Sequence, residues 1–335
     1  MSSSEDHCYR LLTDYANGFM VSQVLFVACE LGVFDLLAEA PGPLAVAAAV
    51  GASSHAMECL LDSCVSLKLL KLEMRGGQDE DMAFYGNTEM SRVYLSRVSP
   101  TSQCSMLLYM ARTTYHCWGH LAQAVREGKN QYLRTFGVPA EELFTAIYSR
   151  SEGEQVQFMQ ALWEVWSMHG RSVLTVFDLS LFPLVCDLGG GAGALAKQCR
   201  CLYPRCHITV FDLPEVVRTA EEHFSLSEEE QIGFQEGDFF KDRLLEADLY
   251  ILARILHDWV DGKCSQLLER VYQSCKPGER WGPLLMQLYS LNMLVQTEGQ
   301  ERTPSHYHAL LSSAGFRDFQ FKKTGVIYYA IVARK

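Results

Sequence analysis

The segment from Asp187 to Gly193 has the clearest potential for chemistry. It reads Asp-Leu-Gly-Gly-Gly-Ala-Gly, directly after an apolar run, and a helical pattern starts behind it at Ala194. A glycine turn between a buried strand and a helix is where an α/β sheet lets a ligand reach the backbone. Gly189, Gly191 and Gly193 follow one another at a spacing of two, closer than the three glycines of a dinucleotide fingerprint, and Asp187 would repel a pyrophosphate. The pattern favours a cationic cofactor that carries an amino acid, such as S-adenosylmethionine, whose ammonium Asp187 can attract.

A second acidic residue supports this prediction. Asp212 ends the strand-like run 207–212, further along the chain. A carboxylate at that place can accept hydrogen bonds from both hydroxyls of a ribose. The alternative is a glycine turn that merely joins a strand to a helix, and the presence of both acids argues against it.

The segment Leu256-His-Asp-Trp259 supplies a candidate general base. It follows a predicted strand, so His257 is expected at the carboxyl edge of the sheet, the same edge as the glycine turn. Methyl transfer from a sulfonium is an in-line displacement, so an oxygen nucleophile needs deprotonation and alignment and little else. We predict Glu301 as the acid that orients the imidazole. Asp258 is the third catalytic candidate; being adjacent to His257 it is expected to point elsewhere, and capping of the next helix is its alternative role.

The composition limits which partners and which cellular compartment we expect for this protein. The net charge is −11, which argues against a nucleic-acid partner. No apolar stretch approaches the roughly 20 residues that span a bilayer, so no membrane partner is expected. Twelve cysteines without C-x-x-C pairs, and no signal segment, predict a cytoplasmic protein. Cys199 and Cys201 would lie about 200° apart on a helix, which makes a zinc site there with Cys206 and His207 a distant alternative, and no metal is predicted.

The N-terminal part predicts an association module. Residues 9 to 39 carry helical apolar spacing and are too apolar to be solvated on all sides, so we expect them to pack against a second copy in a homodimer. Residues 44–85 predict two short helices and a hairpin, as in a winged helix. The second helix carries Glu58 and Asp62 and no arginine, which favours dimerisation over DNA binding.

The remaining chain predicts a doubly wound, Rossmann-like α/β sheet that ends in an antiparallel hairpin. Strands are expected at residues 184–188, 208–212, 232–236, 247–255, 316–322 and 325–332. The helical segment before the sheet is rich in aromatic residues and methionine, and could cover a flat aromatic substrate. We therefore predict a dimerisation domain over residues 1–100, a helical linker and substrate lid over 101–175, and a cofactor-binding catalytic domain over 176–335.

An ordered set of motifs is similar to the plant- and animal-type small-molecule O-methyltransferases that bind S-adenosylmethionine: D-L-G-G-G-A-G (187–193), V-F-D-L-P-E-V (210–216), G-D-F-F (237–240), L-H-D-W (256–259), G-Q-E-R-T (299–303) and S-S-A-G-F (312–316). The resemblance covers nearly the whole chain. It implies a homodimer, a hydroxyindole as the small-molecule substrate, and His257 as the base. To the cofactor it assigns Tyr148, Trp166, Asp212, Gly237, Asp238, Phe239 and Arg254, and to the substrate Asn292, Met293 and Gln296.

The chain departs from this family at one place. After Cys275-Lys-Pro-Gly278 the family continues with a further glycine, an apolar strand that ends in a glutamate, and an acidic loop. Here the chain passes directly to Gly282-Pro-Leu-Leu285. We therefore expect the fifth strand to be missing, the edge of the fourth strand to be open or paired with the last strand, and a second carboxylate beside the catalytic histidine to be absent.

Three interpretations follow from the sequence. The first is an active O-methyltransferase for a hydroxyindole or another small phenol. The second is an inactive or weakly active relative that still dimerises. The third is a winged-helix regulator, against which the acidic composition and the intact L-H-D-W motif argue.

Overall fold

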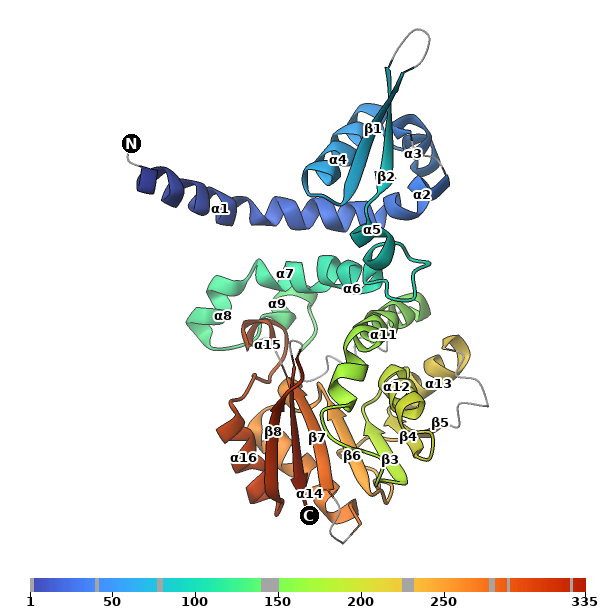
Figure 1. The fold of residues 1–335 in the computed structure, drawn as a ribbon. Coiled ribbons are helices and arrows are strands. Elements are labelled where there is room, and N and C mark those ends of the chain that lie inside the picture. Colours follow the sequence, from blue (N-terminus) through green and yellow to red (C-terminus); the bar gives the residue numbers. More distant parts are fainter. Residues whose placement is uncertain are drawn as a thin grey trace. The chain divides into compact units, whose positions relative to one another are not determined.

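The computed structural model describes residues 3–39, 42–76, 81–139, 151–224, 232–276, 281–287, 290–325 and 328–335. The chain forms two compact units, residues 1–111 and 112–335 (Figure 1). The predicted boundary between a lid and a catalytic domain at residue 175 remains a prediction.

The first unit is built from helices around a small hairpin. Its elements are α1 (Ser3–Glu30), α2 (Val33–Glu39), α3 (Pro43–Val50), α4 (Ser54–Ser66), β1 (Leu70–Gly76), β2 (Asp81–Asn87), α5 (Glu89–Tyr94) and α6 (Cys104–Tyr109). Ser53 caps α4 by accepting from the Ala56 N–H, and Thr88 caps α5 in the same way. Strands β1 and β2 pair antiparallel from Leu70 opposite Asn87 to Gly76 opposite Asp81. The winged-helix-like arrangement of α3, α4 and this hairpin is therefore confirmed.

The expectation that residues 9 to 39 form one stripe against a partner is wrong in its second half. Gly32 has φ +67° and separates α1 from α2. Beyond Phe26 the apolar side chains, among them Val33 and Phe34, are buried in the unit's own core. The exposed apolar side chains of α1 lie in its first part: Tyr9, Leu11, Leu12, Tyr15, Phe19, Met20 and Val21.

The second unit holds the sheet and its helices. Before the sheet come α7 (Tyr115–Trp118), α8 (Leu121–Glu127), α9 (Tyr132–Phe136) and α11 (Glu152–Leu174). The sheet and its connections then follow as β3 (Leu184–Leu188), α12 (Ala194–Leu202), β4 (His207–Asp212), α13 (Pro214–His223), β5 (Ile232–Glu236), β6 (Leu249–Ala253), α14 (Asp261–Ser274), β7 (Trp281–Gln287), α15 (Ser290–Gln296), α16 (Pro304–Ser313), β8 (Arg317–Lys323) and β9 (Tyr329–Arg334).

The sheet contains a strand that the sequence does not predict. Its order is β5-β4-β3-β6-β7-β9-β8, so β7 fills the position between the fourth strand and the C-terminal hairpin (Figure 1). β7 runs parallel to β6, with Leu284 opposite Ile251, and antiparallel to β9. The expected missing strand and open edge are therefore wrong. The pairing with β9 shifts register between Trp281 and Leu284, around Pro283, because proline has no N–H for the ladder.

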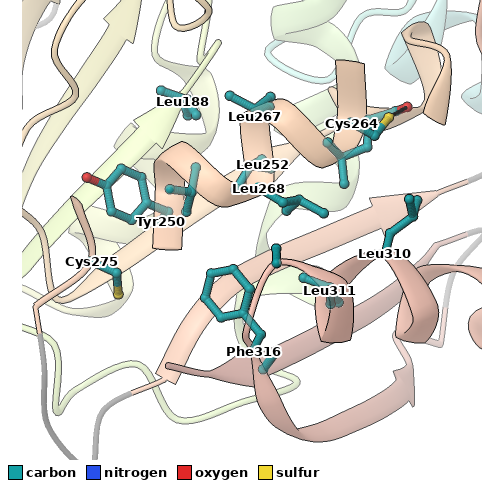
Figure 2. Close-up of a cluster of buried hydrophobic side chains, with 14 of the residues drawn as sticks. Leu188, Tyr250, Leu252, Cys264, Leu267, Leu268, Cys275, Leu310, Leu311 and Phe316 are labelled. Atoms are coloured by element: carbon teal, nitrogen blue, oxygen red, sulfur yellow. Dashed lines mark hydrogen bonds between the residues drawn. The ribbon is translucent and has the colours of Figure 1, made fainter. Parts of the chain in front are cut away.

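The core beneath one face of the sheet comes from α14 and α16 (Figure 2). Leu267 and Leu268 of α14 and Leu311 of α16 are fully buried against Tyr250 and Leu252 of β6. The alternate residues of the strands are buried toward the other face, where α12 and α13 pack on β4 and β5. Burial on both faces is typical of a parallel sheet, and it holds the carboxyl ends of β3, β4 and β6 at one edge.

In the part of the chain that the structure describes, no single helix is long and apolar enough to cross a membrane. The pair α3 and α4 passes such a test only when taken together, by length and composition, and it is bent by 116°.

Candidate active site

The glycine turn, residues 189–193, lies between β3 and α12, as the sequence predicts. Gly189, Gly191 and Gly193 have φ values of +70°, +58° and +82°, which L side chains rarely adopt. A Cβ atom on Gly189 would lie 2.5 Å from the Cδ1 atom of Ile255, whereas one on Gly191 would meet nothing within 4 Å. The turn is thus packed on one side and open at Gly191, where a ligand can touch the backbone.

Asp187 lies beneath this turn as a buried carboxylate. It is 1% exposed, and neither of its oxygens accepts a hydrogen bond from the described residues. Burial, and next to it the negative charge of Asp212, raise the pKa of Asp187 to about 7. A buried acid of this kind is stabilised by any cation that comes within reach.

Asp212, at the end of β4, is tied to the same turn. Its two oxygens accept from the Gly191 N–H and the Leu213 N–H, both at 2.8 Å. Burial raises the pKa of Asp212 to about 6 although these two bonds oppose the shift. Each oxygen keeps a lone pair, so this carboxylate can still accept from two hydroxyls.

We expect Asp212→Ala to weaken S-adenosylmethionine binding by roughly 1.5–3 kcal/mol, the range for a hydrogen bond to a charged group. Isothermal titration calorimetry of both proteins with S-adenosylmethionine and its demethylated product measures the loss. Unchanged affinity would remove Asp212 from the site, and tighter binding of NAD would overturn the choice of cofactor.

The segment after β5 closes against β4. The Gly237 N–H donates to the Asp212 carbonyl oxygen at 2.8 Å, and a Cβ atom on Gly237 would lie 2.5 Å from the Cζ atom of Phe211. Phe239 packs edge-on against Trp259, with ring centroids 6.4 Å apart. Asp238 accepts from the Phe240 N–H and pairs with Lys241 at 2.8 Å, so its described partners are local.

Arg254 follows β6 with φ +59°. A left-handed conformation at a residue other than glycine costs on the order of 1–3 kcal/mol and is common at functional sites. It lies two residues before the turn Leu256–Asp258, which carries the predicted base.

His257 lies in that turn with a carboxylate near each ring nitrogen. Glu301 places Oε1 2.8 Å from Nδ1, and Asp258 places Oδ2 3.7 Å from Nε2. His257 is 3% exposed, and burial raises the pKa of Asp258 although the charge of His257 opposes the shift. Glu301 is where an orienting acid must be. The expectation that Asp258 points elsewhere is wrong, and this acid stands where a second flanking carboxylate was expected to be absent.

The predicted substrate residues lie on α15. Asn292 accepts from the Trp118 Nε1–H at 3.2 Å and from the Gln296 side chain through the same oxygen, Oδ1. Gln296 also lies 3.5 Å from the Thr114 hydroxyl. With Oδ1 occupied twice, the Asn292 amide group presents its N–H donors. Met293 is buried and contacts Thr297, and its predicted role in substrate binding stays a prediction.

Two aromatic residues were predicted to close over the cofactor. Trp166 of α11 is buried against Tyr328, with ring centroids 5.6 Å apart. Tyr328 directly precedes β9, so this described contact is with the sheet. Met159, on the same helix, packs in one cluster with Ala192 of the glycine turn. Tyr148 lies outside the described residues.

Two residues that contact the turn Leu256–Asp258, which we call the histidine turn, were not predicted from the sequence. Arg302 is buried and bonds to the backbone of this turn, and Gly299 is pressed against it. The signal was present in the motif G-Q-E-R-T, but only Glu301 was assigned a role there.

Comparison with known proteins agrees with this geometry. Residues 118–317 match the O-methyltransferase domain, and residues 13–97 match the O-methyltransferase dimerisation domain. The chain belongs to the O-methyltransferase family. It is 76% identical to human acetylserotonin O-methyltransferase over 350 residues and 60% identical to the bovine protein, in both cases over 100% of each chain.

A solved structure with a similar fold is that of human N-acetylserotonin methyltransferase in complex with SAM. It matches with a TM-score of 0.93 and 73% identity over 100% of this chain and 99% of that chain. The human alignment spans 350 residues, whereas this chain has 335, so this chain is shorter within a match that covers both proteins completely.

Proposed function

We propose that this protein transfers the methyl group of S-adenosylmethionine to the 5-hydroxyl of N-acetylserotonin, giving melatonin. The observation that carries the proposal is the pair His257–Glu301, held at the sheet edge that also carries the glycine turn. Identity of 76% to a protein named acetylserotonin O-methyltransferase supports the choice of substrate.

The residues at the sheet edge fit the cofactor. The unpartnered carboxylate of Asp187 suits an ammonium, the free lone pairs of Asp212 suit a ribose, and the open face at Gly191 lets a chain lie against the backbone. No phosphate is required by this set, and two buried acids would repel one. When bound, S-adenosylmethionine supplies an electrophilic methyl group on a cationic sulfur.

The histidine turn then does the proton chemistry. His257 donates its Nδ1–H to Glu301, which leaves the Nε2 lone pair free to accept the proton of the substrate hydroxyl. With the cofactor bound, the substrate oxygen would take the methyl group as the carbon–sulfur bond breaks, and Nε2 of His257 would hold the proton until it passes to solvent. Glu301 and Asp258 stabilise the imidazolium that forms.

Asn292 supports recognition of an acylated substrate. Its side-chain oxygen is occupied by Trp118 and Gln296, so it offers only donors to a ligand. The acetamide of N-acetylserotonin provides a carbonyl acceptor, whereas serotonin carries an ammonium in its place. The match favours N-acetylserotonin over serotonin, because the ammonium of serotonin leaves the donors of Asn292 without an acceptor.

Turnover with labelled S-adenosylmethionine tests the function. We expect methylation of N-acetylserotonin and far slower methylation of serotonin and of simple phenols. Cofactor binding with no turnover of any of these would favour the inactive relative, and preference for another phenol would change the substrate. Binding of neither cofactor nor substrate would overturn the proposal.

We further propose that the enzyme is a cytoplasmic homodimer that forms through the first part of α1. All twelve cysteines are free thiols, as in reducing compartments, and the dimerisation-domain match covers residues 13–97. Among the described residues, Leu12 and Tyr15 of α1 are 64% and 73% exposed.

We expect a molar mass of two chains in solution at micromolar concentration, because burial of the exposed apolar side chains of α1 needs a second copy. Leu12→Asp with Tyr15→Asp is expected to give monomers, while Arg10→Asp, on the same helix, keeps the dimer. Light scattering measures the mass. A wild-type monomer that is otherwise folded would refute this assembly.

A further inference from the structure

Arg302 connects the two segments that carry the catalytic pair. Its Nη1 donates to the Leu256 carbonyl at 2.7 Å, and its Nη2 donates to the Trp259 carbonyl at 2.7 Å. A longer bond of 3.3 Å joins Nη1 to the Gln300 carbonyl, and Nε donates to Oδ1 of Asp261 at 2.8 Å. We call Arg302 and these four acceptors the Arg302 clamp.

The residues of the clamp are direct neighbours of the catalytic residues along the chain. Leu256 and Trp259 are the residues immediately before and after the pair His257-Asp258, and Glu301 is the neighbour of Arg302 itself. The Arg302 side chain is fully buried, and a guanidinium in such a place fixes the groups that it bonds to. Its bonds therefore set the spacing between the histidine turn and the Glu301 backbone.

Gly299 gives independent evidence that the loop 297–302 lies in close contact with the histidine turn. A Cβ atom at this position would overlap the carbonyl oxygen of His257 and lie 2.6 Å from the carbonyl carbon of Asp258. The Gly299 N–H donates to the Thr297 hydroxyl at 3.1 Å, which holds the loop in this close approach. The loop 297–302 thus lies directly on the backbone of the histidine turn.

We infer that Arg302 is a positioning residue for methyl transfer: it holds Glu301 on Nδ1 of His257 and so keeps Nε2 aimed at the substrate. The inference rests on the proposed function. Arg302 acts only through its neighbours, because Nε, Nη1 and Nη2 all bond to groups within the protein and the side chain has no exposed surface.

A double-mutant cycle tests the inference. Arg302→Met and Glu301→Gln should each lower kcat, Arg302→Met by on the order of 10²-fold, the effect of misplacing a catalytic group by about 1 Å. The KM for N-acetylserotonin and the Kd for S-adenosylmethionine should stay within a few-fold. In the Glu301→Gln background, adding Arg302→Met should cost little more, since the contact that it maintains is already lost.

Two further variants are needed: Asp261→Asn as a second test of the clamp and His306→Gln as its control. Asp261→Asn weakens the clamp without leaving a cavity, so a smaller loss of kcat is expected even where Arg302→Met does not fold. His306 contacts Asp261 at 3.0 Å but has no described bond to the histidine turn, so His306→Gln should keep kcat. Multiplicative losses in the double mutant, or full activity of Asp261→Asn, would overturn the inference.

A measurement on the resting protein separates this inference from the proposed function. In protein labelled with ¹⁵N-histidine, the Nδ1–H of His257 bonded to a carboxylate gives a proton resonance far downfield, assigned by its loss in His257→Ala. We expect it to disappear or move upfield in Glu301→Gln and Arg302→Met and to persist in His306→Gln. Persistence in Arg302→Met would contradict the clamp, whereas absence of turnover in the wild type would contradict only the function.

Discussion

Replacement of His257 by alanine is expected to lower kcat by about 10²–10⁴, the usual effect of removing a positioned general base. The imidazole is the group at the sheet edge that has both a carboxylate on Nδ1 and a free Nε2 lone pair, so its loss leaves the substrate hydroxyl without a proton acceptor. Steady-state kinetics with N-acetylserotonin near neutral pH measure the change. The affinity for S-adenosylmethionine should remain, since the two acids expected to hold it, Asp187 and Asp212, lie on β3 and β4.

His207→Ala is the matched control for this experiment. His207 is exposed at the start of β4, the opposite end of the strand from Asp212, and its removal should leave the rate unchanged. If His257→Ala methylates as fast as the wild type, His257 is not the base.

Replacement of Asp187 by asparagine is expected to change stability and cofactor binding in opposite directions. The pKa of Asp187 in the folded protein is about 7, raised from 3.8 by burial and by Asp212. Folding therefore favours the protonated form: the stability that this provides is fully present below pH 4 and is lost as the pH rises through 7. The buried charge costs the ligand-free protein roughly 4 kcal/mol at high pH.

We therefore expect the thermal midpoint of the ligand-free protein to fall between pH 6 and pH 8. Asp212, whose pKa is also raised, contributes in the same direction. Asp187→Asn should raise the midpoint at pH 8 and flatten its pH dependence, and should weaken cofactor binding by about 2–5 kcal/mol, because the ammonium loses a buried partner. Thermal unfolding at pH 6, 7 and 8, with and without S-adenosylmethionine, measures both effects. A midpoint that does not depend on pH over this range would show that Asp187 is already ionised in the ligand-free protein. An asparagine variant that still binds tightly would show that the ammonium does not depend on the charge of Asp187.

The sequence predicted those parts of the fold where local pattern and tertiary structure agree. β3 and β5 have the predicted bounds because each is a short run between turn residues, and the glycine turn lies between β3 and α12 as predicted. β7 was missed because the chain lacks the strand motif that the family has after Gly278, and Gly282 and Pro283 give no local pattern of a strand. A strand is required here because the backbone groups of β6 and β9 on either side must be paired. No local sequence pattern shows this requirement.

The candidate site was also predicted only in part. His257 and Glu301 were found because each belongs to a motif next to a predicted element. The orientation of Asp258 and the bonds of Arg302 depend on how two distant segments meet, and spacing along the chain does not determine which neighbour a charged side chain will face. The break at Gly32 was missed because the apolar pattern continues through it.

The strand β7 has a consequence for how such a protein tolerates changes in its length. The position between β6 and β9 is defined by two rows of backbone groups that must be paired, and a neighbouring segment of suitable length has filled it. β7 ends at Gln287 and α15 begins at Ser290, so the helix that carries Asn292 and Gln296 follows directly on a central strand. An insertion or deletion before residue 281 that moved a different segment into this position would therefore also move α15, since only two residues of sequence separate β7 from α15.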